Sequence, residues 1–162
     1  MRRTDREVTD PAQIARIIEK AKIVHVSMAD GGRPYVVPLH YGALFNDGIL
    51  TLYLHCANEG RKLDFIKKNP QVFIEIDTDI APISGGEIPC KYGSAYASVM
   101  GEGTAQIVEN GDEKIFGLEC IMKTQTGRDF TVSAQMAAAV TVLKIEVPRV
   151  TAKSRRLEAQ KH

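Results

Sequence analysis

Apolar and polar residues alternate with the two-residue period of β-strands along most of the chain, and helical spacing is limited to short segments. Two turn signals, Asp30-Gly31-Gly32 and Asn46-Asp47-Gly48, predict hairpins between the first three strands. Because parallel strands need long crossovers, these short connections favour a mainly β fold, a six-stranded antiparallel β-barrel with flanking helices. The expected strands are residues 23–29, 35–43, 49–57, 71–78, 95–108 and 139–147.

Helical spacing marks the connections. The first helix is expected at residues 11–22, with Asp10 as its N-cap and Pro11 at the first helical position. The remaining expected segments are a helix after Asn58, a helix at residues 111–123, a long loop rich in Pro and Gly at residues 80–92, and a polar tail after Pro148.

Proline and glycine residues inside the expected strands restrict where these strands can lie in the sheet and how they can pair. Pro38 cannot donate to a β-ladder, so its strand is expected at a sheet edge, or the position faces something other than a strand. A planar ligand lying against this strand would explain the proline, and an ordinary edge strand explains it equally well. Gly101 and Gly103 interrupt the strand at residues 95–108 and suggest a bulge or a close backbone approach.

Composition narrows the class of protein. A chain of 162 residues suits one domain over residues 1–162, with a basic tail at about residues 154–162. A net charge of +1 provides no global attraction for nucleic acid or anionic membrane. We expect no signal peptide, because the N-terminus is charged, and no membrane span. The three cysteines, Cys56, Cys90 and Cys120, are widely spaced, which predicts free thiols and a cytoplasmic protein.

The segment at residues 49–66 carries the strongest chemical signal. Asn58 is a candidate N-cap for the helix that follows, and Arg61 and Lys62 lie in the first helical turn. A cation at this end of a helix interacts unfavourably with the helix dipole, by about 0.3–1 kcal/mol. With a bound phosphate the arrangement becomes favourable, because the backbone N–H groups, the dipole and both cations would attract the anion. The alternative is two solvated surface charges.

Two histidines lie at the ends of adjacent expected strands. His55 shares a strand face with Thr51 and Tyr53, the more polar face, where it would meet a ligand or solvent. Neither His40 nor His55 has a second ligand at metal spacing, so we expect no metal site, and a hydrogen-bonded structural role is the alternative for each. We find no nucleophile motif and no nucleotide-binding fingerprint in the sequence.

Five segments together resemble one family: PYVVPLHYG, LYLHCANEGRKLDFI, NPQVFIEID, YASVMGEGTAQIV and the terminal VTAK. They are similar to the nitroimidazole-resistance (Nim) branch of the pyridoxamine 5′-phosphate oxidase-like flavoproteins, over roughly residues 4–153. The resemblance implies an FMN-binding split β-barrel that forms a homodimer with FMN at the subunit interface. The cofactor-binding residues it implies are Val37, Pro38, Leu39, His40, Tyr41, His55, Ala57, Asn58, Arg61, Lys62, Ser98 and Lys153, with His55 as the catalytic candidate.

The implied function is an FMN-dependent oxidoreductase that moves electrons from NAD(P)H to a small acceptor, a nitro group in Nim-like proteins. The alternative is a non-enzymatic split barrel that binds flavin or haem, in which His55 or His40 would be a haem ligand. A phosphate at Lys62 favours FMN over haem. Pyridoxamine 5′-phosphate oxidase activity itself fits less well, because we identify no second phosphate site for its substrate.

Overall fold

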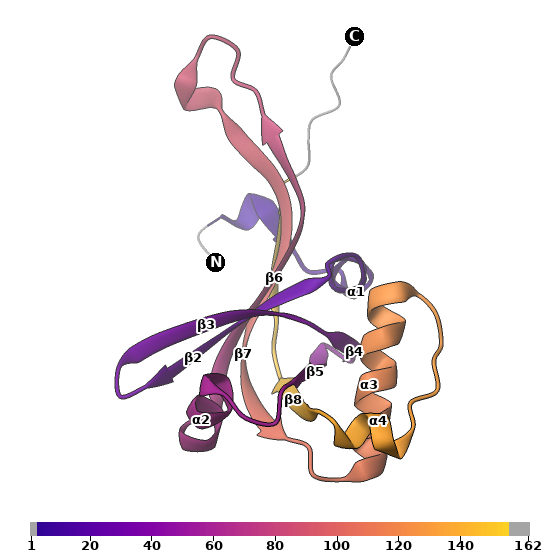
Figure 1. The fold of residues 1–162 in the computed structure, drawn as a ribbon. Coiled ribbons are helices and arrows are strands. Elements are labelled where there is room, and N and C mark those ends of the chain that lie inside the picture. Colours follow the sequence, from indigo (N-terminus) through magenta and orange to yellow (C-terminus); the bar gives the residue numbers. More distant parts are fainter. Residues whose placement is uncertain (1–2, 156–162) are drawn as a thin grey trace.

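The computed structural model describes residues 3–155, and Figure 1 shows a strongly twisted sheet with helices packed around it. The strands are β1 (Glu7–Val8), β2 (Ile23–Asp30), β3 (Arg33–His40), β4 (Gly42–Asn46), β5 (Ile49–Cys56), β6 (Gln71–Ile83), β7 (Gly93–Ile107), β8 (Thr141–Val147) and β9 (Thr151–Arg155). The helices are α1 (Pro11–Lys20), α2 (Arg61–Lys68), α3 (Gly111–Thr126) and α4 (Ala134–Ala138), with 3-10 turns η1 (Thr4–Arg6) and η2 (Pro89–Lys91).

The sheet is antiparallel throughout, in the order β3-β2-β6-β7-β8-β5-β4, and β9 pairs with both β7 and β1. The two end strands, β3 and β4, are not hydrogen-bonded to each other within residues 3–155, so the barrel is open along one line. The mainly β, antiparallel split barrel is therefore confirmed. The sheet has nine strands in the described chain where six were expected.

The predicted strand at residues 35–43 is in fact two strands. It breaks at Tyr41, so that β3 pairs with β2 at one end of the sheet and β4 pairs with β5 at the other. Tyr41 turns its ring into the core, where it is fully buried and its hydroxyl donates toward the carbonyls of Ile18 and Ala21. Alternation alone could not show this break, because apolar spacing continues through it.

The loop predicted at residues 80–92 is confirmed for residues 84–92, which include η2, and wrong for residues 80–83, which belong to β6. β6 continues to Ile83 and β7 begins at Gly93, so the two strands form a hairpin that stands away from the barrel (Figure 1). Within the described residues, their pairing register shifts only between Thr78 and Ala81, where Asp79 has a φ of 59°. Pro and Gly at the hairpin tip caused the misassignment, because both usually mark loops.

The polar tail predicted after Pro148 is also wrong in its first part. Residues 151–155 form β9, in which Lys153 pairs with Glu7 of β1 and with Ser98 of β7. Ser154 and Arg155, placed in the basic tail by sequence, belong to this strand. The rest of that tail, residues 156–162, lies outside the described residues.

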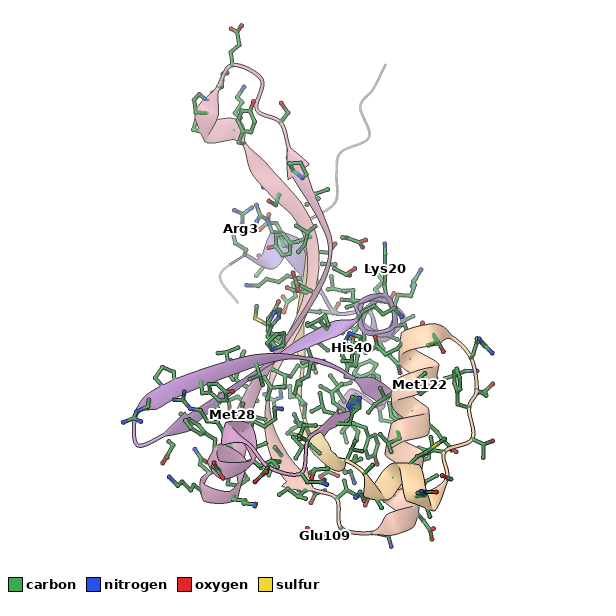
Figure 2. The ribbon with its side chains drawn as sticks, in the orientation of Figure 1. Arg3, Lys20, Met28, His40, Glu109 and Met122 are labelled. Atoms are coloured by element: carbon green, nitrogen blue, oxygen red, sulfur yellow. The ribbon has the colours of Figure 1, made fainter. Side chains whose placement is uncertain are left out.

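The core lies inside the barrel, between the inner faces of the strands and helix α1, and Figure 2 shows side chains filling this space. Asp10 caps α1 as predicted, accepting a hydrogen bond from the Ala12 N–H at 3.0 Å. Gly101 and Gly103 mark a close backbone approach, since a Cβ at either would lie within 3 Å of β8 or the residues after it. No bulge interrupts the β6–β7 pairing at these two glycines. No helix within residues 3–155 is long and apolar enough to cross a bilayer.

Candidate functional site

Three predicted site residues come together where β3, β5 and α2 meet. His40 is the last residue of β3, His55 lies near the end of β5, and Lys62 lies in the first turn of α2. The pKa of His55 is lowered, first by the partial shielding of its ring from water and then by the nearby charges of His40 and Lys62. A neutral imidazole at ordinary pH can accept a hydrogen bond as well as donate one.

His55 lies past the region that α3 covers. On the same face of β5, Tyr53 is only 4% exposed, because it packs under α3 against Phe116 and Gly117, whereas His55 remains exposed. The prediction of a polar, accessible face is thus confirmed for His55 and wrong for Tyr53. His40 is likewise exposed at the sheet edge (Figure 2).

The start of α2 leaves backbone donors without partners. Gly60 occupies the N-cap position with φ of 141°, a conformation open mainly to glycine, and it has no side chain with which to cap the helix. The Gly60 carbonyl accepts from the N–H groups of Leu63 and Asp64 at 2.9 and 3.3 Å. Among the described residues, the N–H groups of Arg61 and Lys62 have no acceptor.

Asn58 is therefore not the N-cap, contrary to the sequence prediction. Its side-chain oxygen accepts from the Thr141 hydroxyl at 3.0 Å, and its amide nitrogen lies 3.5 Å from the Ala139 carbonyl. Both partners lie where α4 leads into β8. Asn58 thus fastens the loop before α2 to β8 rather than covering the helix end.

The two cations of the first turn differ in their surroundings. The guanidinium of Arg61 lies over the rings of Tyr35 and Phe65, at 4.7 and 5.3 Å from their centroids. Lys62 lies close enough to His55 and Cys56 to act on the pKa of each, although burial is the main cause of the raised pKa of Cys56. Within residues 3–155, neither cation has a carboxylate within ion-pair distance.

Strand β3 is an edge strand, as Pro38 predicted. Among the described strands it pairs with β2 alone, where Pro38 lies opposite His25. Pro38 and His40 are exposed, whereas Val37 and Leu39 turn toward the core, so the last two could meet a cofactor only through their backbone. Tyr41 has fewer groups available to a cofactor than expected, because its ring is buried and its carbonyl already accepts a hydrogen bond from the Gln125 amide at 2.8 Å.

Ser98 and Lys153 form a second group on the outer face of the sheet. They lie directly opposite each other on β7 and β9, and with Met100 and Thr151 they line an open hollow of about 240 Å³. Ser98 is buried and Lys153 half-buried.

A single chain does not bring this second group to the first. Strands β2, β6 and β7 separate β3 from β9 in the sheet. His40 and Lys153 are thus four strand spacings apart, or about 19 Å along the sheet. The predicted site residues therefore fall into two half-sites: a phosphate half-site at His40, His55, Arg61 and Lys62, and a sheet half-site at Ser98 and Lys153.

One cluster escaped the sequence prediction, which expected no metal-ligating group. His25, Glu75 and Asp77 place their ligand atoms within 4.8 Å of one another, and His25 Nδ1 lies 3.1 Å from Glu75 Oε2. Burial and the charge of Asp77 raise the pKa of Glu75. The residues lie on β2 and β6, and only the pairing of His25 with Glu75 across these strands brings them together.

The fold is an open antiparallel split barrel, and an uncapped basic helix start lies beside its exposed edge strand. These two features together define the class of split-barrel protein to which the chain belongs. The family model described as pyridoxamine 5′-phosphate oxidase matches residues 10–154. The chain belongs to this family, in its Nim-like branch. The structure of a candidate 5-nitroimidazole antibiotic resistance protein from Bacteroides thetaiotaomicron is 32% identical, with a TM-score of 0.75 over 91% of this chain and 85% of that one.

Two more distant structures share the fold alone. The flavocytochrome Anf3 from Azotobacter vinelandii is 17% identical, with a TM-score of 0.75 over 99% of this chain and 76% of its own. An FAD and heme binding protein from Mycobacterium smegmatis is 12% identical, with a TM-score of 0.76 over 97% and 77%. Among curated proteins, none matches the chain.

Proposed function

We propose that this protein is an FMN-dependent oxidoreductase that works as a homodimer, with FMN held at the subunit interface. Electrons would pass from NAD(P)H to a small acceptor. The observation that carries the proposal is the start of α2, where Lys62 and two N–H groups, none of them with a partner among residues 3–155, lie beside an exposed edge strand. When bound, FMN would supply the electron-transfer chemistry.

The phosphate half-site fits the phosphate of such a cofactor. The N–H groups of Arg61 and Lys62 are available as donors, and the helix dipole favours an anion there. Lys62 adds a positive charge without a carboxylate to neutralise it in the described chain, and such charge-assisted bonds are the strong ones. Ala57 and Asn58 precede the helix in a loop that Asn58 fixes to β8, so this loop would form one wall.

The exposed side of β3 suits the flat ring. Pro38 removes one N–H from the edge, while the backbone groups between Val37 and Tyr41 that are not used for pairing with β2 remain available. His55 lies close to both His40 of this strand and Lys62, and its lowered pKa keeps the imidazole neutral and able to exchange a proton near the ring. His55 is thus the candidate for a catalytic role.

The sheet half-site would come from the second chain. Ser98 and Lys153 lie three and four strand spacings from His40 in their own chain, or about 14 and about 19 Å along the sheet, which favours their use at the site of a partner. A homodimer would then hold two equivalent sites, each built from the phosphate half-site of one copy and the sheet half-site of the other.

A nitro group is the proposed acceptor, because the structure with 32% identity is named as a candidate 5-nitroimidazole antibiotic resistance protein. The cytoplasm is the proposed location. It holds reduced nicotinamides, and its reducing conditions suit the free thiols of Cys56, Cys90 and Cys120.

Titration of the purified protein with FMN tests the site. Lys62→Ala should weaken binding by about 1.5–3 kcal/mol if Lys62 makes a charge-assisted bond to the phosphate. This corresponds to a rise in Kd of about ten- to 150-fold. Lys67→Ala is the matched control, since Lys67 is an exposed lysine at the other end of the same helix. Equal FMN affinity in the wild type and both variants would refute the phosphate site.

Haem binding is the second candidate, favoured by the closeness of His40 and His55. Both imidazoles are exposed and near enough for one to lower the pKa of the other. An absorption spectrum of freshly purified protein separates the candidates. Bands near ~375 and ~450 nm would support flavin, whereas a Soret band that is lost in His40→Ala or His55→Ala would favour haem.

A further inference from the structure

The hairpin at residues 79–95, called the arm below, is the part of the molecule that the proposed site does not explain. β6 and β7 contain 13 and 15 residues, whereas no other strand of the described chain exceeds eight. The extra length carries the arm away from the barrel, as Figure 1 shows. Within residues 3–155, the arm meets other elements toward its base, where Lys20 of α1 pairs with Asp79 and the guanidinium of Arg155 in β9 lies beside Gly93.

The tip of the arm has a defined shape. The Tyr92 hydroxyl donates to the Gly86 carbonyl at 3.0 Å, and the Gly86 N–H donates to the Ser84 hydroxyl at 3.2 Å. Gly85 packs so closely that a Cβ there would lie 2.6 Å from the Ile88 carbonyl oxygen. Side-chain and backbone contacts therefore hold the turn and the short η2 helix together.

The arm presents apolar side chains to water at both of its ends. Ile80, near the base, is 67% exposed, and at the tip Tyr92 is 57% and Ile88 43% exposed. A two-stranded hairpin is marginally stable in water by itself, and grouped apolar exposure marks surfaces that bind other molecules. The arm therefore needs a surface to cover it, and the described part of this chain does not supply one.

We propose that the arm packs along a second copy of this chain and clasps the dimer. This inference rests on the proposed function, in which Ser98 and Lys153 complete the site of the other copy. The arm ends at Ala95, three residues before Ser98 on β7, so it extends directly from the sheet half-site. From Thr78 to the tip at Gly86 it spans eight residues, or about 26 Å.

The arm begins three residues from Ser98 on β7. In the proposed dimer, Ser98 of one copy meets α2 and β3 of the other, and the arm lies along the surface of that other copy. Two-fold symmetry gives each dimer two such contacts, so every substitution in the arm acts twice. The exposed apolar side chains of the tip thereby become part of the interface.

Sedimentation over a dilution series tests the clasp. The double variant Ile80→Asp/Ile88→Asp should raise the dimer dissociation constant at least about ten-fold, because it places charge where apolar surface is buried. Ile49→Asp is the matched control, since Ile49 is 49% exposed on the β4–β5 hairpin. Circular dichroism verifies that each variant is folded. A dissociation constant within two-fold of wild type for the double variant would overturn the proposal.

Cross-linking identifies directly the molecule that the arm contacts. Cys90 is exposed in η2 at the arm tip, and a photoreactive maleimide can be attached there in a Cys120→Ala background, since Cys56 is buried. We expect illumination to give a product of twice the chain mass, with the partner attachment point away from its own arm. Products confined to single chains would overturn the clasp, whatever FMN does. Loss of FMN binding without loss of the cross-link would instead refute only the proposed function.

Discussion

Tyr41 joins the end of the proposed flavin strand to helix α1, and removing its hydroxyl tests that link. The side chain is fully buried, and its oxygen lies 2.5 Å from the Ile18 carbonyl oxygen and 3.0 Å from that of Ala21. Ile18 lies in the last turn of α1 and Ala21 is the C-cap residue. The carbonyls at this end of a helix have no N–H donor within the helix itself. Tyr41→Phe keeps the ring and leaves these carbonyls in an apolar core.

The expected cost follows from that geometry. A lost hydrogen bond is worth about 1 kcal/mol, and a buried carbonyl left without a donor costs about 1–3 kcal/mol. The single hydroxyl hydrogen serves two acceptors, so we expect a total loss of about 2–3 kcal/mol in the free energy of unfolding. For a chain of this size, that lowers Tm by about 4–12 °C.

Urea denaturation followed by circular dichroism, on protein freed of flavin, measures the loss. Tyr92→Phe is the control, because it removes the same atom from a tyrosine whose hydroxyl also bonds a carbonyl but whose side chain is 57% exposed. We expect less than about 0.5 kcal/mol for it. Equal losses in the two variants would refute the assigned role of Tyr41.

The stability that the Tyr41 hydroxyl contributes depends on pH in a defined direction. Burial raises the pKa of Tyr41 well above its usual range. A group that holds its proton more tightly when folded stabilises fully below its unfolded pKa, about 10 for tyrosine, and the stabilisation fades as pH rises further. The stability difference between wild type and Tyr41→Phe should therefore shrink above about pH 10. A difference that grows there would contradict the buried hydroxyl.

Three shorter predictions test the packing and chemistry around the site. Gly42→Ala should destabilise the fold by more than about 2 kcal/mol in urea denaturation, because its Cβ would lie 2.4 Å from the α3 backbone, whereas Gly111→Ala, with open space around it, should be nearly neutral. NMR titration should place the pKa of His55 below its usual 6.5, and Lys62→Ala should raise it; no change would exclude their coupling. His55→Ala should retain FMN but alter turnover of a nitro acceptor, and unchanged turnover would make His55 structural.

The sequence predicts a structural feature correctly where that feature is determined by residues close to one another in the chain. Asp10 and Pro11 start α1, and the two glycine turns after Asp30 and Asn46 close hairpins with positive φ at Gly31 and Gly48. The edge position of Pro38 also followed from one residue, because a missing N–H cannot be tolerated between two strands. Each of these features depends on a few consecutive residues.

Features that depend on distant residues were missed. β9 is polar and short, and it is a strand because β7 and β1 pair with it on both sides. The break at Tyr41 is fixed by carbonyls of α1, about 20 residues earlier in the chain. The separation of Ser98 and Lys153 from Lys62 depends on sheet order, which no spacing along the chain encodes.

The corrected position of Asn58 bears on the proposed phosphate site itself. An N-cap side chain satisfies the same backbone N–H groups that an anion would use, so a capped helix start and an anion site at one position compete. The sequence predicted both at once, with Asn58 as cap and Lys62 as phosphate ligand. In the structure Gly60 takes the N-cap position without a capping group, while Thr141 holds Asn58 away from the helix end. The helix start is thereby left open for an anion, which supports the proposal more strongly than a capped helix beside two cations would.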